Sequence, residues 1–350
     1  MVQIFPPCVR VRVGFPAQDL RDRSDGSGHA RADRGNSVIE VLARTLPFFA
    51  VIGLGYWAGR TRFFTEEATA YLTKFVFYFA LSAMLFRFAA NLSLAEVYNT
   101  QFVLAYLTGC FAVYGLASLV GRIRKLPRAE IAVEAQVSVI GNTGFLGVPM
   151  LVVLIGPQAA GPALMALALD LIVFSSLITI LLTLSREGRL SRAAVRAVGL
   201  GIIRNPMIGS MVLGLVWSAT RLPVPGPVND FLSLLGAAAT PGALFAIGAS
   251  LAYKSAERVQ VAIWLSFCKL VLHPAAVAFA ALVVFDVEPF AAGVMIAVAA
   301  LPVAGNVYIL AQHYGVAPQR VSSSILISTA VSILSVSAVI ALVMKTLIAP

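Results

Sequence analysis

The sequence carries little charge for its length. Only 12% of its 350 residues are Asp, Glu, Lys or Arg, whereas a soluble domain carries about 25%. So few charges cannot cover the surface of a water-soluble particle. Hydrophobic residues make up 59% of the chain, and the mean hydropathy is +0.89. Lipid must therefore solvate much of the exterior.

Cysteine and histidine are also scarce, with three of each. Cys8, Cys110 and Cys268 lie far apart and form neither a disulfide framework nor a metal-ligand motif. The histidines are scattered, and the sequence has no zinc-protease motif, no nucleophile elbow and no Walker A motif. We therefore expect no metal, no cofactor, no enzymatic activity and no ATP-driven transport by this chain itself.

Apolar segments long enough to cross a bilayer recur along the chain. A helix needs about 20 apolar residues to cross about 30 Å of hydrocarbon. From Ser37 onward the sequence predicts ten such helices, so the fold class is all-α and integral to the membrane. They are expected at 39–59, 67–90, 100–121, 129–155, 160–184, 200–220, 228–252, 259–284, 289–313 and 321–348.

The first 36 residues differ from the rest. Residues 19–36 are polar, rich in Arg, Asp and Gly, and lack an apolar period, which predicts disorder. No apolar run with a small-residue cleavage site follows the early Arg residues, so a signal peptide is not expected. The alternatives for 1–36 are a disordered tail, a start codon assigned too far upstream, or a tail with a function of its own.

Basic residues gather in alternate connections between the apolar segments. The opposite set of connections holds little beyond Arg87 and Arg221, with Lys345 near the C-terminus. By the positive-inside rule, both termini lie outside and the connection at 185–199 lies in the cytoplasm. This predicts a multi-pass protein of a cytoplasmic (inner or plasma) membrane, and the net charge of +10 then reflects topology and not a nucleic-acid partner. The basic-rich connections contain Arg60, Arg62, Arg122, Arg124, Lys125, Arg128, Arg186, Arg189, Arg192, Arg196, Arg204, Lys254, Arg258 and Arg320.

The chain is expected to contain two five-helix repeats, 37–184 and 200–350, joined by a cytoplasmic linker at 185–199. Because five is an odd number, the second copy would enter the membrane in the opposite direction and form an inverted repeat. Segments 4 and 9 are each interrupted at the centre by Gly, Asn and Pro, as GNTGFLGVP (141–149) and LPVAGNVY (301–308). Proline removes a helical hydrogen-bond donor, and a broken helix persists in the membrane only where it lines a polar cavity or packs on protein.

Matching breaks in the two halves predict a substrate site. The N-termini of half-helices carry partial positive charge and free N–H groups, which suits an anion. The alternative is an ordinary pair of kinks in packed helices, where Gly allows close approach. The candidate substrate-binding residues are Asn142, Thr143, Gly144, Gly147, Pro149, Pro302, Gly305, Asn306, Val307 and Tyr308.

The same motifs resemble the auxin efflux carrier family, which includes plant PIN exporters and bacterial malate or malonate permeases. The resemblance runs from about Thr45 to the C-terminus. Beyond the two breaks, it rests on Arg204-Asn205-Pro206, on Thr240-Pro241 with the run FAIGASL (245–251), and on KLVLHP (269–274).

This resemblance implies a fold like that of bile-acid symporters and sodium/proton antiporters. Segments 1, 2, 6 and 7 would form a scaffold. Segments 3–5 and 8–10 would form a core that carries substrate at the crossing of the broken helices and slides like an elevator.

Two charged residues are expected near the middle of the bilayer, Asp170 in segment 5 and Lys269 in segment 8. A charge at that depth is costly and marks a candidate functional site. We expect the two to approach closely, either as a buried pair that fixes helix packing or as part of ion coupling. Glu134, on the cytoplasmic arm of segment 4, is interpreted as an entry-side or solvated residue.

Together these features indicate a secondary active transporter of a small organic acid anion. A passive channel or a non-transporting membrane subunit is the alternative, because the repeat alone fits both. The acid, the direction of transport, the coupling ion (H⁺ or Na⁺) and the oligomeric state, with a homodimer among the options, are left open by the sequence.

Overall fold

The computed structural model describes residues 38–92, 99–187, 192–253 and 259–348. Within these ranges the secondary structure is helical, apart from one isolated bridge between two extended residues. The all-α prediction is therefore confirmed. The tail predicted at 1–36 lies outside the described residues.

The helices follow the apolar segments closely. In the first half they are α2 (Val38–Arg60), α3 (Glu66–Phe75), α4 (Leu81–Ala90), α6 (Thr100–Ile123), α7 (Arg128–Val139), α8 (Val148–Leu154), α9 (Ala160–Leu169) and α10 (Ser175–Glu187). In the second half they are α11 (Arg192–Ile203), α12 (Pro206–Ala219), α13 (Gly226–Ala237), α14 (Ala239–Ala252), α15 (Val259–Phe267), α16 (His273–Phe279), α17 (Pro289–Ala299), α18 (Gly305–Tyr314) and α19 (Pro318–Val343).

Wider π-helical turns continue several of these helices without ending them. Such turns join α3 to α4, α9 to α10 and α15 to α16, and one precedes α8. Those that bear on the site are Thr143–Gly147, Asp170–Phe174 and Cys268–Leu272. A π-helical turn inserts one residue into the helical ladder and is frequent at functional sites.

Seven of the described helices are long and apolar enough to cross a membrane. Three shorter apolar helices, Thr143–Leu154, Pro206–Ala219 and Pro289–Ala299, fall within the expected segments 4, 6 and 9. Each is short for a physical reason, because segments 4 and 9 are broken and Pro206 begins a new helix after Asn205 caps it. The full set of ten crossings stays a prediction.

The expected linker at 185–199 is largely helical. Helix α10 continues to Glu187, and α11 occupies Arg192–Ile203. The sequence predicts a linker here because the stretch lies between two apolar segments, but residues such as Arg are also good helix formers. The two halves are therefore joined through helical structure on both sides of residues 188–191.

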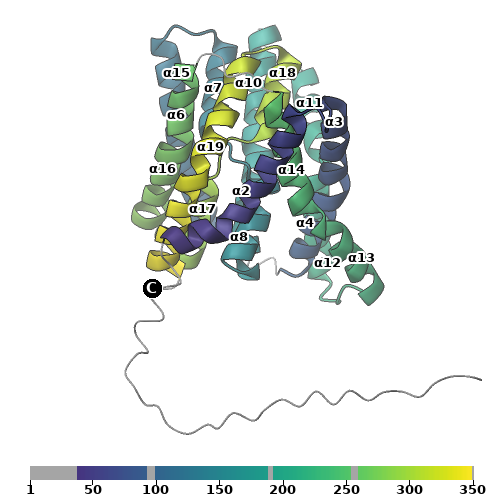
Figure 1. Cartoon of the computed structure of the whole chain (residues 1–350). Helices are drawn as coiled ribbons and strands as arrows, with labels where there is room; N and C mark the ends of the chain where they lie inside the picture. The colour runs from purple at the N-terminus through teal and green to yellow at the C-terminus, as the bar shows by residue number, and fades with distance from the viewer. Residues whose placement is uncertain (1–37, 93–98, 188–191, 254–258, 349–350) are drawn as a thin grey trace, which may run out of the picture. The chain divides into compact units, whose positions relative to one another are not determined.

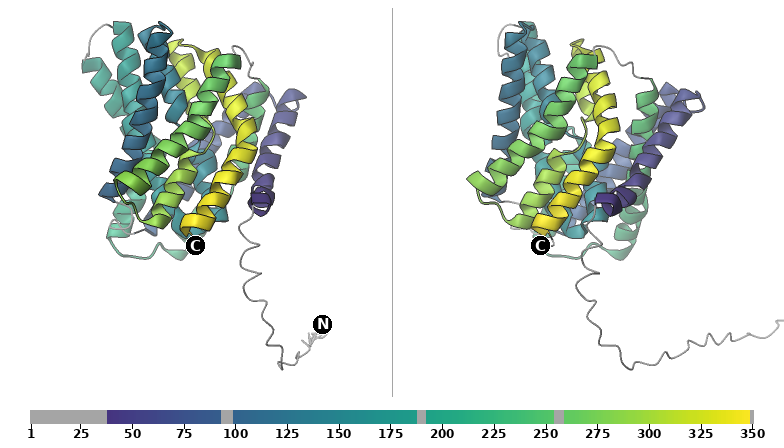
Figure 2. Two further views of the ribbon diagram at one scale, coloured as in Figure 1. Left: turned by 90° about the vertical axis from the view of Figure 1, so that its left-hand side faces the viewer. Right: turned by 60° about the vertical axis from the view of Figure 1, so that its left-hand side comes forward.

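Packing divides the described helices into two groups. In one group, α2 packs on α14, and α4 packs on α12 and α13. In the other, α6 packs on α7 and α16, and α17 packs on α9, α16 and α19. Figure 1 shows α6, α15 and α16 on one side of the bundle and α3, α4, α12 and α13 on the other. The groups also touch where α2 lies beside α19, as the purple and yellow helices of Figure 2 show.

Glycines let α2 and α14 approach until their backbones touch. A Cβ on Gly248 would lie 1.9 Å from the carbonyl oxygen of Ile52, and one on Gly55 would lie 2.2 Å from that of Phe245. Close approach through small residues is a main source of helix association where lipid removes the hydrophobic driving force. This contact fixes two of the helices that flank the broken segment 4.

Gly248→Ala is expected to destabilise the protein strongly, because the new methyl group would overlap backbone atoms that cannot move aside. Overpacking costs about 1–3 kcal/mol, which lowers a denaturation midpoint by roughly 5 °C or more. Thermal denaturation in detergent measures this. Gly53→Ala in α2 is the matched control, because nothing lies within 4 Å of its added Cβ. Equal midpoints for the two variants would contradict the tight contact.

Candidate functional site

The two broken segments meet in the middle of the bundle and hydrogen-bond to each other through their backbones. The Asn142 N–H donates to the Pro302 carbonyl at 2.8 Å, and the Ala304 N–H donates to the Ile140 carbonyl at 3.1 Å. Between these bonds, Gly141 and Val303 form an antiparallel bridge. Backbone groups released by the breaks are thus satisfied across the crossing, as a low-dielectric interior requires.

Each break ends one helix and begins another. Helix α7 ends at Val139 and α17 ends at Ala299, whereas the following half-helices begin at Thr143 and Gly305. The first N–H groups of a helix have no partner within it and carry partial positive charge. Two such N-termini therefore lie at the crossing.

The predicted substrate-binding residues fall into three environments. Thr143, Gly144, Gly147, Pro302 and Val307 are buried around the crossing, Tyr308 is half-buried, and Gly305 and Asn306 are exposed. Asn142 is 7% exposed and has no hydrogen bond from its side chain among the described residues. The Asn306 side chain likewise makes no hydrogen bond among the described residues. Pro149 lies further along α8 and lines a separate cavity.

Asp170 contacts the crossing through the hydroxyl group of Thr143. The Thr143 hydroxyl donates to Asp170 Oδ2 at 3.0 Å, and the Tyr106 hydroxyl donates to Asp170 Oδ1 at 2.9 Å. The carboxylate is buried and begins the π-helical turn after α9. Thr143 is the first residue of the half-helix, so Asp170 contacts the break itself.

Lys269 contacts the second break. Its Nζ donates to the Ala299 carbonyl at 2.5 Å, and Ala299 is the last residue of α17. A cation at a helix C-terminus is favourable, because the final carbonyls carry partial negative charge. Gly141 allows this approach, since a Cβ there would lie 3.2 Å from Lys269 Nζ.

A histidine and a cysteine extend this contact toward α6. His273 Nδ1 lies 3.1 Å from both Lys269 Nζ and the Ala299 carbonyl oxygen, and its Nε2 lies 3.1 Å from Cys110 Sγ. All four residues are buried. A polar network thus contacts the end of α17 at the second break, and His273 is part of it as well as the start of α16.

The expected close approach of Asp170 and Lys269 does not take the form of a direct ion pair. No ion pair joins them among the salt bridges of the described residues. The two charges still influence each other electrostatically, but each is held by its own partners at a different break. Both residues face the crossing, which the sequence did not predict.

The sequence suggested that Glu134 is solvated, but the structure shows that it is not. It is buried and bridges Arg124 at 2.6 Å and Arg320 at 2.9 Å. Arg320 also pairs with Glu130 at 2.6 Å. The cluster ties the start of α19 to the end of α6 and to α7.

Comparison with known proteins places the chain in a family. The family model described as "Membrane transport protein" matches residues 40–340. The chain belongs to this family. It is the auxin efflux carrier family that the motifs indicated, and the protein is a multi-pass membrane transporter.

Relatives of this membrane transport protein match it along most of its length. The "Putative malonate transporter" of Rhizobium meliloti (strain 1021) is 29% identical over 308 residues, which covers 87% of this chain and 96% of that protein. The "Uncharacterized transporter YfdV" of Escherichia coli (strain K12) is 25% identical over 290 residues, covering 81% and 91%. The "Uncharacterized transporter MJ1031" of Methanocaldococcus jannaschii is 25% identical over 292 residues, covering 81% and 92%.

The region matched by the membrane transport family contains the whole crossing. Both breaks, Asp170 and Lys269 lie within 40–340, whereas all of the predicted tail at 1–36 and the end of α19 lie outside it. No group of three or more His, Cys, Asp or Glu that could hold a metal ion occurs in the part of the chain that the structure describes.

Proposed function

We propose that this chain is a secondary active transporter of a small organic acid anion, which binds where the two broken helices cross. The observation that carries the proposal is the pair of half-helix N-termini held together by backbone hydrogen bonds at the breaks. Two positive helix ends and two free amides, on Asn142 and Asn306, suit a carboxylate.

The transport motion is proposed to be of the elevator type. The group containing α2, α3, α4, α12, α13 and α14 would serve as the scaffold. The group containing both broken helices would move and carry the substrate. Extensive contacts within each group support this division, since a moving body must stay packed while it slides. The ten crossings would form two inverted five-helix repeats, with the breaks at equivalent positions.

The substrate is proposed to be a small mono- or dicarboxylate. The name of the Rhizobium meliloti relative makes malonate the first acid to test. The crossing offers neutral amides and helix ends to an anion, and Lys269 adds a positive charge behind the break. The protein would reside in a cytoplasmic membrane with both termini outside and α11 near the cytoplasmic face. A gradient of H⁺ or Na⁺ would drive it, and a homodimer is one arrangement it could adopt.

Uptake into proteoliposomes tests this proposal. Malonate, malate, lactate and indole-3-acetate are each supplied with a pH gradient, with a sodium gradient, and with neither. We expect accumulation of at least one carboxylate above its external concentration, and only with a gradient. Flux that merely equilibrates would indicate a passive channel. No flux of any acid, from protein shown to be folded, would indicate a non-transporting subunit.

A further inference from the structure

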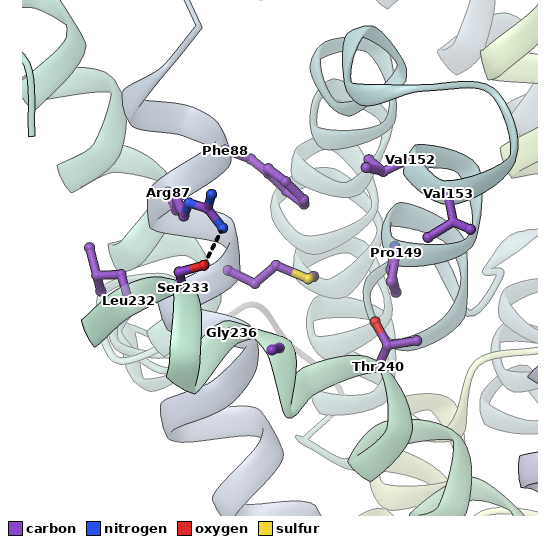
Figure 3. Close-up of a pocket in the computed structure, with 11 residues that line it drawn as sticks. Arg87, Phe88, Pro149, Val152, Val153, Leu232, Ser233, Gly236 and Thr240 are labelled. Carbon is purple, nitrogen blue, oxygen red and sulfur yellow. Dashed lines mark hydrogen bonds between the residues drawn. The ribbon is translucent and has the colours of Figure 1, made fainter. Parts of the chain in front are cut away.

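A second polar feature lies away from the crossing, in a cavity of about 220 Å³. Its walls come from both helix groups, with α4, α13 and α14 on one side and α8 on the other. Figure 3 shows Arg87 and Phe88 across the cavity from Pro149, Val152 and Val153. Most of the lining is apolar, and Arg87 is its one charged side chain.

Neutral groups hold Arg87 in place. Its Nε donates to Asn229 Oδ1 at 3.2 Å, and its Nη1 donates to Ser233 Oγ at 3.0 Å, both on α13. A guanidinium carries five N–H donors, so these two bonds leave three without a partner among the residues that the structure describes. Among the described residues Arg87 forms no ion pair, and it is only partly exposed.

An Arg in this position is unusual for two reasons. A partly buried charge normally has a counter-charge, because removing it from water is costly. Arg87 is also one of the few basic residues in the connections and helix ends opposite the basic-rich set, where the positive-inside pattern disfavours Lys and Arg. A fixed cation in an apolar cavity binds a carboxylate strongly, through paired N–H bonds and weak screening.

We propose that this cavity is an entry site for the transported carboxylate on the side opposite the basic-rich connections, with Arg87 as the residue that binds it. The inference rests on the proposed function and adds a second binding site for the same substrate. Pro149 lies seven residues beyond Asn142, which corresponds to roughly 10 Å along a helix. A small acid therefore occupies the cavity and the crossing in turn, and not both at once. Thr240 and Ser233 add hydroxyl groups to the same cavity.

Transport kinetics on the two sides of the membrane test the assignment. Initial rates of malonate uptake are measured in right-side-out and in inside-out membrane vesicles. Arg87→Gln is expected to raise the KM for malonate by about tenfold or more in right-side-out vesicles, since a charge-assisted hydrogen bond is lost. The maximal rate, and the KM in inside-out vesicles, should change by less than about twofold. The KM of Arg87→Lys in right-side-out vesicles should lie between those of the wild type and Arg87→Gln, because lysine keeps the charge and loses the fork geometry.

Arg221→Gln is the matched control. Arg221 belongs to the same sparsely basic side and is exposed, but it does not line the cavity. Its KM should equal that of the wild type on both sides. Equal KM values for Arg87→Gln and Arg221→Gln, or an equal loss on both sides of the membrane, would overturn the entry site.

Direct binding separates this inference from the proposed function. Malonate should raise the thermal denaturation midpoint of an Asn142→Ala variant, which lacks the amide proposed to bind substrate at the crossing, and the added Arg87→Gln change should abolish that rise. Malonate binding by the wild type without accumulation would contradict the transport proposal alone. No stabilisation of the Asn142→Ala variant by malonate would overturn the entry site alone. Repeating the kinetics in vesicles of phosphatidylcholine tests whether a lipid headgroup occupies the cavity. Loss of the effect of Arg87→Gln on the KM in these vesicles would overturn the carboxylate assignment.

Discussion

Asn142→Ala and Asn306→Ala are each expected to reduce malonate uptake by about 100-fold or more. Each asparagine lies at the start of a half-helix, where its amide would hydrogen-bond a carboxylate beside the free backbone N–H groups. Removing a polar partner from a bound anion costs about 1.5–3 kcal/mol, or one to two factors of ten. A second loss is expected because the substrate also shifts from its productive position.

The side-chain changes leave the crossing itself intact. The bonds from Asn142 to Pro302 and from Ala304 to Ile140 are made by backbone atoms, so alanine preserves them. Folding is checked by thermal denaturation, which should match the wild type within a few degrees. Gln312→Ala is the matched control, because it removes an exposed amide two turns further along α18. Uptake at the wild-type rate in both asparagine variants would move the substrate site away from the crossing.

The sequence predicted features that depend on neighbouring residues. The lengths of apolar runs gave helix boundaries within a few residues for most segments, because about 20 apolar residues are needed to cross the bilayer. The two breaks were also visible, since Gly141, Pro302 and their neighbours disfavour helix wherever they occur. The backbone hydrogen bonds between the two broken segments were not predicted, because they depend on how the segments cross.

Features that depend on how helices are rotated against each other were not predicted. Asp170 and Lys269 were both expected near the middle of the bilayer, but the helix faces on which they lie direct each one to a different break. Glu134 was interpreted as an entry-side or solvated residue, and its ion pair with Arg320 was not predicted because the two lie far apart in sequence. No role was inferred from the sequence for Tyr106 or Cys110 in segment 3. Their polar contacts depend on how α6 packs.

One feature of the sequence nevertheless pointed to the cavity. Arg87 stood out as a basic residue on the side where Lys and Arg are rare, but topology alone gave it no role. Its function could be inferred only once α13 and α8 were placed beside α4. Exceptions to the positive-inside pattern are therefore useful starting points in a transporter sequence.

Asp170→Asn is expected to abolish gradient-driven accumulation while leaving exchange of malonate for malonate largely intact. Asparagine has nearly the same shape as aspartate and can still accept the hydrogen bond from Tyr106. It cannot bind or release a proton, and it is a weaker ligand for Na⁺ than a carboxylate. The ratio of internal to external malonate should therefore fall to about one, as expected when coupling is lost but the substrate site is kept. Accumulation ratios and counterflow rates, measured in the same proteoliposomes, distinguish the two activities.

Tyr106→Phe separates coupling from packing at this position. It removes one hydrogen bond to Asp170 but keeps the carboxylate and the bond from Thr143. If the carboxylate couples an ion, Tyr106→Phe keeps accumulation well above that of Asp170→Asn, even though it loses about 1 kcal/mol of stability. If Asp170 only fixes α9 against the crossing, Asp170→Asn retains accumulation, and any loss follows thermal stability in both variants. The second pattern would assign Asp170 to the architecture of the crossing, because its contact with Thr143 would then serve to hold the half-helix in place for substrate.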